Sequence, residues 1–168
     1  MKSESVRIRP STVSDVAVIT QIYRENVLDG TGSFEFVPPD AQEMTRRYDD
    51  VVGRGCPWLV AEIDGVVVGY AYAAPFRARE AYKFTVEDSI YVSRDAWRKG
   101  IGRALLEGLI DACRTAGYRQ LIALIGDSTN TGSIRVHEVC GFQHCGVLKD
   151  VGTKFDRWLD VVLMQLEL

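Results

Sequence analysis

The segments DSIYVS (88–93) and RKGIGR (98–103) decide the fold of this 168-residue chain. The first has the β-branched and aromatic residues of a strand, and the second is a basic glycine turn that leads into an amphipathic helix. Glycine lets the backbone approach a ligand closely, and the first N–H groups of a helix have no partner inside the helix. A strand, a basic glycine turn and a helix in this order therefore predict a site for a phosphate-bearing ligand.

Two common phosphate-binding motifs do not fit this turn. A dinucleotide fingerprint would require a third glycine where the chain has Leu105, and no Gly-Lys-Ser or Gly-Lys-Thr of a P-loop occurs in the chain. Taken by itself, the turn is also compatible with a helix that simply begins after glycine. The remaining segments must decide between these alternatives.

The composition of the whole chain limits the classes of protein to consider. A hydrophobic share of 46%, a charged share of 26% and a net charge of −3 predict one globular domain over residues 1–168. The net charge gives no general attraction to nucleic acid, and no apolar run approaches the roughly 20 residues that span a bilayer. The N-terminus does not resemble a secretory signal, so we expect a cytoplasmic protein with reduced thiols. Cys140, His144 and Cys145 lie close together but lack a second ligand pair, so we expect no metal site.

The hydrophobic periodicity predicts about seven strands and about four helices. A hairpin is expected around Asp64-Gly65, a dipeptide that strongly favours a tight turn between strands. The fold class is therefore α+β (mixed αβ), with a mixed sheet flanked by helices. The expected strands are 6–9, 58–63, 66–73, 86–92, 121–125, 142–148 and 158–166. The first expected helix begins at Val16 and is stopped by Gly30, the second starts at Asp40 and is ended by Gly53 and Gly55, and the other two are 100–116 and 133–139.

Several segments, in this order, resemble one family. They are TVEDSIYVS (85–93), IGDS (125–128), HE (137–138) and KFDRWLDVV (154–162), with AAPFRAREAY (73–82) as a further similarity. Together they resemble the GNAT acetyltransferase superfamily, and within it the phosphinothricin and methionine sulfoximine or sulfone N-acetyltransferases. The resemblance covers essentially the whole chain. It implies the GNAT fold and acetyl transfer from acetyl-CoA to a primary amine.

The resemblance also implies where acetyl-CoA would bind. Its pyrophosphate would lie on the backbone amides of the basic turn, and its pantetheine arm would follow the preceding strand where two parallel strands separate. The superfamily usually has Gln or Arg where this chain has Trp97, so most phosphate contacts should come from backbone N–H groups. The implied cofactor-binding residues are Ile90, Tyr91, Val92, Arg98, Lys99, Gly100, Ile101, Gly102, Arg103, Asn130 and Ser133.

The implied chemistry needs a base and a donor. Glu87 stands at the position of the general base, and His137 at the position of a proton donor to the leaving thiolate or of a residue that positions substrate. A free glutamate is a poor base because its pKa is about 4.3, so burial or a neighbouring charge must raise the pKa of Glu87. Asp88 should face the opposite side of the strand. A backbone N–H near Val92 is expected to stabilise the oxyanion.

The implied acceptor is a small amino acid that carries anionic or strongly polar oxygens. Arginine forks suit such oxygens. The expected substrate-binding residues are Phe34, Phe76, Arg77, Arg79, Tyr82, Val86 and Glu87. A peptide or protein N-terminus is the alternative acceptor, and an acyl-CoA-binding module without catalysis is a further alternative. The family commonly forms homodimers, in which the apolar strand 161–166 could take part.

Overall fold

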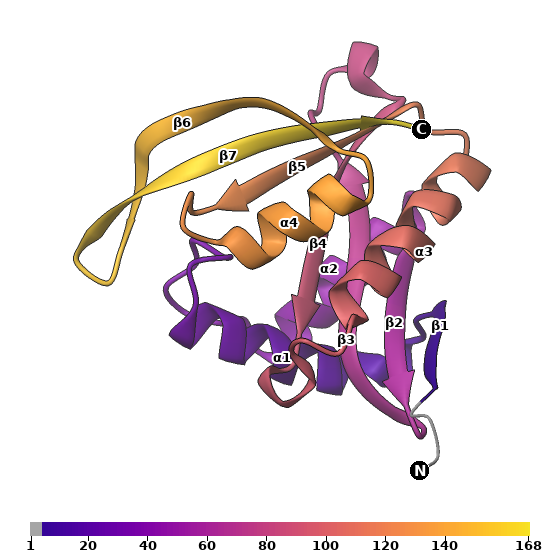
Figure 1. The fold of residues 1–168 in the computed structure, drawn as a ribbon. Helices are drawn as coiled ribbons and strands as arrows, with labels where there is room; N and C mark the ends of the chain where they lie inside the picture. The colour runs from indigo at the N-terminus through magenta and orange to yellow at the C-terminus, as the bar shows by residue number, and fades with distance from the viewer. Residues whose placement is uncertain (1–4) are drawn as a thin grey trace.

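A computed structural model describes residues 5–168 and contains a seven-stranded sheet in the order β1-β2-β3-β4-β5-β7-β6 (Figure 1). The predicted fold class is confirmed, and the Asp64-Gly65 turn does join β2 to β3. The elements are β1 (Val6–Pro10), α1 (Val16–Asp29), α2 (Ala41–Gly53), β2 (Trp58–Ile63), β3 (Val66–Pro75), β4 (Thr85–Val92), α3 (Ile101–Thr115), β5 (Gln120–Gly126), α4 (Thr131–Val139), β6 (Gln143–Lys154) and β7 (Arg157–Glu167).

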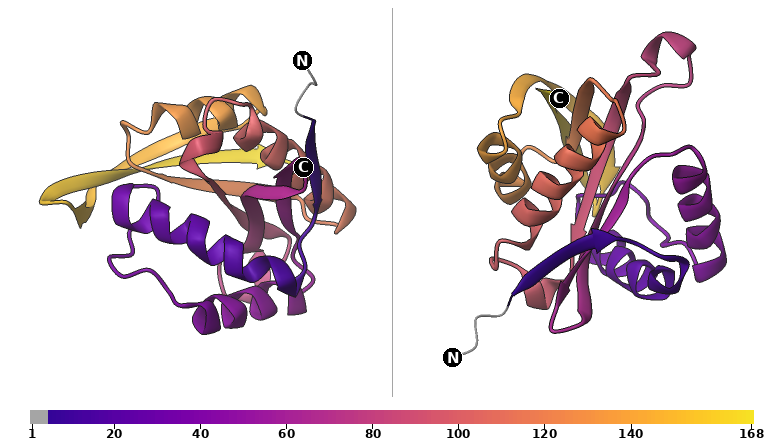
Figure 2. Two further views of the ribbon diagram at one scale, coloured as in Figure 1. Left: turned by 90° about the horizontal axis from the view of Figure 1, so that it is seen from below. Right: turned by 90° about the vertical axis from the view of Figure 1, so that its right-hand side faces the viewer.

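The sheet separates two layers of helices. Helices α1 and α2 lie on one face, and α3 and α4 lie on the other (Figure 2). Each layer is held by an apolar helix face, because Ile19 of α1 and Leu105, Leu106 and Leu109 of α3 are fully buried. The two faces of β3 and β4 therefore look into different surroundings, and this determines which side chains can share a site.

Strands β4 and β5 form a short parallel pair in an otherwise antiparallel sheet. They are paired only from Thr85–Gln120 to Glu87–Ile122, although β4 continues to Val92 and β5 to Gly126. Beyond Glu87 the two strands diverge (Figure 1). The predicted separation of two parallel strands is thus present, and it begins at the residue predicted to be the base.

The predicted end of the sixth strand at residue 148 is wrong. Strand β6 continues to Lys154 and pairs with β7 around a turn at Phe155 and Asp156, whose φ angles are 53° and 55°. The β6–β7 hairpin extends away from the helices (Figure 1), so most of β6 is exposed and lacks the alternating burial that sequence periodicity detects. Strand β6 is an edge of the sheet. None of the helices between residues 5 and 168 has the length and apolar character needed to cross a membrane.

Candidate active site

The basic glycine turn has the geometry of an anion cradle. Gly100 is the N-cap of α3 with φ 77°, a left-handed conformation that glycine adopts without a steric penalty, and Arg98 is left-handed too, with φ 62°. The indole Nε1 of Trp97 donates to the Val92 carbonyl at 3.0 Å and ties the turn to the end of β4. The Nε of Arg103 donates a hydrogen bond to Oε1 of Glu107 at 2.7 Å. The free amides of α3 and the cations around them favour a phosphate group here.

Strand β4 has backbone groups that face the gap beside β5. The amide of Ser93 donates to the Val68 carbonyl of β3 at 2.9 Å. Successive N–H groups of a strand point to opposite edges, so the N–H of Val92 points toward β5. No strand between residues 5 and 168 pairs with that edge of β4 after Glu87. An extended amide ligand can therefore hydrogen-bond there.

Glu87 and Asp88 face opposite sides of the sheet, as strand alternation predicts. Glu87 lies across from Ala74 of β3 on the α1–α2 face, and its half-buried carboxylate has no hydrogen-bond partner among the described residues. Burial raises the pKa of Glu87, the negative charge of Asp88 raises it further, and the positive charge of Arg77 partly opposes the shift. Glu87 therefore has a carboxylate that can accept a proton from a ligand, and its pKa is shifted upward, as a general base requires.

His137 is buried on the other face, next to Asp88. Its Nδ1 bonds to the Ser133 carbonyl at 2.7 Å and its Nε2 to the Asp88 carboxylate at 3.2 Å, and the residue is only 3% exposed. A carbonyl only accepts, so Nδ1 carries a proton. Burial alone lowers the pKa of His137, but the Asp88 hydrogen bond and charge outweigh it and raise the pKa. Each ring nitrogen of His137 thus has a hydrogen-bond partner, and the side chain links α4 to β4 at the point where β4 and β5 separate.

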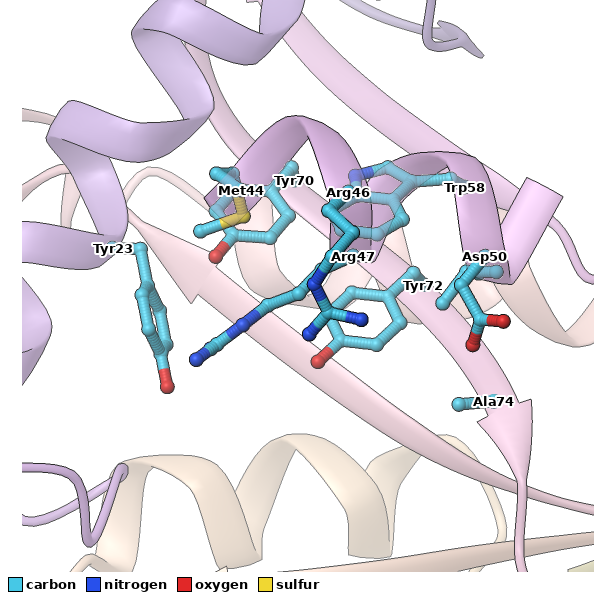
Figure 3. Close-up of a pocket in the computed structure, with 10 residues that line it drawn as sticks. Tyr23, Met44, Arg46, Arg47, Asp50, Trp58, Tyr70, Tyr72 and Ala74 are labelled. Carbon is cyan, nitrogen blue, oxygen red and sulfur yellow. The ribbon is translucent and has the colours of Figure 1, made fainter. Parts of the chain in front are cut away.

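A hollow of about 200 Å³, here called the Tyr72 pocket, opens on the α1–α2 face (Figure 3). One of its lining residues, Ala74, lies directly across from Glu87 in the β3–β4 pair. The stacked rings of Trp58 and Tyr72, with centroids 4.2 Å apart, form a rigid wall, and arginine side chains extend between Tyr23 and Tyr72 (Figure 3). Arg47 is held by the Glu35 and Glu43 carboxylates at 2.7 and 2.8 Å. The pocket is lined by Tyr23, Met44, Arg46, Arg47, Asp50, Val51, Trp58, Tyr70, Tyr72 and Ala74.

The loop between β3 and β4 carries most of the predicted acceptor residues, but it surrounds a different hollow. The guanidinium carbon of Arg77 lies 4.8 Å from the centroid of the Phe76 ring. The positive charge of Arg77 also lowers the pKa of Glu87, against the effect of burial. The second hollow, here called the Arg79 pocket, measures about 250 Å³ and shares no lining residue with the Tyr72 pocket. It is lined by Arg54, Cys56, Pro75, Arg77, Ala78, Arg79, Glu80, Tyr82, Lys83, Thr85, Val86 and Tyr118.

The remaining predicted residues lie at the far end of β5. Asn130 caps α4: its side chain accepts from the Ser133 amide at 3.3 Å and donates to the Gly126 carbonyl at 3.2 Å. Phe34 packs against Gly126 and Gly152 so closely that a Cβ on either glycine would collide with its ring. Phe34 thus lines neither pocket. Among residues 5–168, no three His, Cys, Asp or Glu side chains form a group that could hold a metal ion.

The Acetyltransferase (GNAT) family matches residues 19–142, which is most of the chain. The chain belongs to this family. Phosphinothricin N-acetyltransferase of Alcaligenes faecalis is 54% identical over 90% of the chain and 77% of that protein. L-methionine sulfoximine/L-methionine sulfone acetyltransferase of Salmonella typhimurium is 39% identical over 96% of the chain and 94% of that protein. A solved GNAT phosphinothricin acetyltransferase from Sinorhizobium meliloti, in complex with acetyl-CoA, superposes with a TM-score of 0.94 at 45% identity, covering 97% of the chain and 88% of that structure.

The predicted GNAT resemblance and acetyltransferase class are therefore confirmed. The sequence did not indicate the pocket residues Tyr23, Arg47 and Tyr72. Tyr72 has the pattern of an ordinary strand residue, and Arg47 that of a solvated helix face, so only the tertiary fold brings them beside Glu87 in this GNAT protein.

Proposed function

We propose that this GNAT acetyltransferase transfers the acetyl group of acetyl-CoA to the α-amine of phosphinothricin-like or methionine sulfoximine- and sulfone-like amino acids. The observation that carries the proposal is Glu87, a half-buried carboxylate without a hydrogen-bond partner in the described chain, placed where β4 and β5 separate. The names of the similar proteins support this class of acceptor.

The chain's backbone fits the cofactor in two places. The amides at the start of α3, opened by Gly100, suit a pyrophosphate, and the unpaired edge of β4 suits the amides of a pantetheine arm. Bound acetyl-CoA supplies the thioester carbonyl. The residues proposed to hold it are Ile90, Tyr91, Val92, Arg98, Lys99, Gly100, Ile101, Gly102, Arg103, Asn130 and Ser133.

In this mechanism Glu87 takes the proton of the acceptor's ammonium group, directly or through water, and leaves a neutral amine to attack. The raised pKa of Glu87 reduces the difference between the pKa of the carboxylate and the pKa of the acceptor's amine, which makes the proton transfer easier. The N–H of Val92, which points into the strand gap, donates to the carbonyl oxygen as negative charge develops on it. Both groups belong to the same strand, so β4 alone fixes their relative positions.

His137 as a proton donor to the thiolate stays a prediction. In the structure its Nε2 faces Asp88, so donation would require that hydrogen bond to break. We assign His137 the role of holding Asp88 and α4 against β4. A variant that removes the imidazole distinguishes the two roles, as described in the Discussion.

For the acceptor, we propose that the amine enters from the Tyr72 pocket. This pocket lies on the same face of the sheet as Glu87 and is lined by Ala74, the residue directly across from it. Arg77 is the loop cation whose charge reaches Glu87, and it is proposed to bind an acceptor oxygen. The roles predicted for Phe34, Phe76, Arg79, Tyr82 and Val86 remain proposals, since Phe34 contacts two glycines, Phe76 lines neither pocket, and the other three line the Arg79 pocket.

An acceptor panel tests the proposal. Release of the CoA thiol is measured with phosphinothricin, methionine sulfoximine, methionine sulfone and a peptide with a free N-terminus. We expect turnover with the free amino acids and little with the peptide, because the Tyr72 pocket holds only about 200 Å³. Turnover with the peptide alone would assign the chain to peptide N-termini, and acetyl-CoA binding without any turnover would indicate a non-catalytic module.

We also propose a cytoplasmic homodimer. Strand β7 lies between β5 and β6, so β6 is an edge strand that a second copy can reach, and Val147, Leu148 and Val151 on it are 42%, 47% and 55% exposed. The homodimer is tested by light scattering after size exclusion. Cells that express the chain should gain resistance to phosphinothricin, because the acetylated amine no longer resembles the free amino acid.

A further inference from the structure

Lys154, the last residue of β6, buries its ammonium group at the end of α1. Its Nζ donates to the carbonyls of Val27, Gly30 and Ser33 at 2.6, 2.8 and 2.7 Å, and the residue is 3% exposed. The last carbonyls of a helix have no partner inside the helix, and a cation is favourable at that end. Burial lowers the pKa of Lys154. An ammonium loses hydration when buried, and here each of its three N–H bonds has an acceptor in return.

The segment that Lys154 holds is hydrogen-bonded to two residues that line the Tyr72 pocket. The hydroxyl of Ser33 lies 2.9 Å from that of Tyr23, and it accepts from the amide of Glu35 at 3.2 Å. The Glu35 carboxylate then accepts from Arg47 at 2.7 Å. Tyr23 and Arg47 both line the pocket beside Glu87, so hydrogen bonds link Lys154 to two pocket walls.

The same segment also fixes Phe34. Its ring packs on Gly126 at the end of β5 and on Gly152, two residues before Lys154 on β6. The ammonium and the aromatic ring therefore attach the segment to the hairpin at adjacent points. This arrangement allows little sliding of residues 33–35 relative to β5.

We propose that Lys154 is a positioning residue for the acceptor: it holds residues 30–35 so that Tyr23 and Arg47 form the wall of the Tyr72 pocket. The proposal rests on the proposed function, because it assumes that the acceptor enters this pocket. It assigns Lys154 no contact with acetyl-CoA and no part in proton transfer.

The first test is Lys154→Met, which keeps the length of the side chain and removes the ammonium. We expect the acceptor KM to rise by about tenfold or more, because a displacement of about 1 Å in a positioning group has effects of this size. The acetyl-CoA KM should change by less than about twofold, because Lys154 makes no contact with acetyl-CoA in this proposal. A simple loss of folded protein would lower the rate and leave both KM values unchanged, so a selective rise in the acceptor KM distinguishes the two cases. Lys149→Met is the matched control, since Lys149 lies on the same strand with a 71% exposed side chain. An acceptor KM like that of the unmodified chain would overturn the proposal.

Hydrogen–deuterium exchange provides a readout that does not need turnover. In Lys154→Met the amides of residues 30–35 should exchange faster than in the unmodified chain and in the control, and unchanged exchange would overturn the proposal. If the unmodified chain acetylates no amino acid, the proposed function fails, while the exchange result still decides whether Lys154 holds the segment.

Glu35→Gln keeps the proposal testable if Lys154→Met does not fold. This substitution weakens the ion pair with Arg47 at the other end of the path and leaves Lys154 in place. We expect a higher acceptor KM at an unchanged melting temperature. An unchanged acceptor KM in this folded variant would overturn the proposed path from Lys154 to the pocket.

Discussion

Replacing Glu87 by glutamine is the most direct test of the mechanism. The two side chains have nearly the same shape, and the Glu87 carboxylate has no hydrogen-bond partner among the described residues that the amide would lose. The loss should therefore be confined to proton transfer. General-base catalysis contributes about 10²–10⁴-fold, so kcat should fall by that factor, which is about 2.7–5.5 kcal/mol of activation free energy. The KM for acetyl-CoA should hardly change.

The pH dependence gives the same prediction a second readout. With the unmodified chain, kcat/KM should rise with pH through the pKa of Glu87, which lies above the ordinary value of a glutamate because the carboxylate is half-buried. In Glu87→Gln this limb should disappear, and only the titration of the acceptor's own amine, at alkaline pH, should remain.

Stability supplies the control for Glu87→Gln. An acid whose pKa is raised by folding binds more protons when folded, so it lowers stability as pH rises through that pKa. The glutamine variant should therefore be at least as stable as the unmodified chain at pH 7. Thiol release measures the rate, denaturant unfolding measures the stability, and Glu167→Gln serves as a surface control. A kcat within about threefold of the unmodified chain would refute Glu87 as the base.

Three further substitutions have defined outcomes. Gly126→Ala should lower the free energy of unfolding by about 1–3 kcal/mol, because the new methyl group meets the ring of Phe34, whereas Gly132→Ala, with open space around it, should not; denaturant titration compares the two. His137→Phe should cost about 3–5 kcal/mol of stability by leaving a buried carboxylate unpaired, and full stability with a kcat reduced about a hundredfold or more would instead identify a proton donor. Trp97→Phe should raise the acetyl-CoA dissociation constant measured by calorimetry, because the indole no longer ties the phosphate turn to β4, and unchanged binding would contradict that role.

The order of the elements could be predicted from the sequence because local signals agree with the fold. The Asp64-Gly65 turn, the helix that follows Gly100 and the apolar run of β5 each depend on a few neighbouring residues. The full length of β6 could not be predicted, because residues 149–154 extend the strand only through their pairing with β7. Its closing turn also lacks glycine, and Phe155 and Asp156 adopt the left-handed conformation instead.

The candidate site was predictable in part. Strand alternation places Glu87 and Asp88 on opposite faces, and family resemblance selects Glu87 as the residue proposed to be the base. The partners of His137 could not be predicted, since its contact with Asp88 joins residues far apart in sequence. The position of Arg79 around a separate hollow also depends on the tertiary fold, which brings the loop and Tyr118 to the same hollow and which no local pattern encodes.

The short pairing of β4 and β5 gives the sheet two edges in its interior, in addition to β1 and β6 at its margins. An unpaired strand edge is normally a liability that attracts other extended chains. Here the interior position restricts access to a thin, extended molecule. An acyl-CoA of suitable shape would act as the missing strand, so the backbone groups that recognise it are the ones that complete the sheet. We therefore expect the amides of Asp88, Ile90 and Val92, which point toward β5 and have no strand partner there, to exchange faster than the amide of Val86 in the free protein, and this difference to shrink when the cofactor binds.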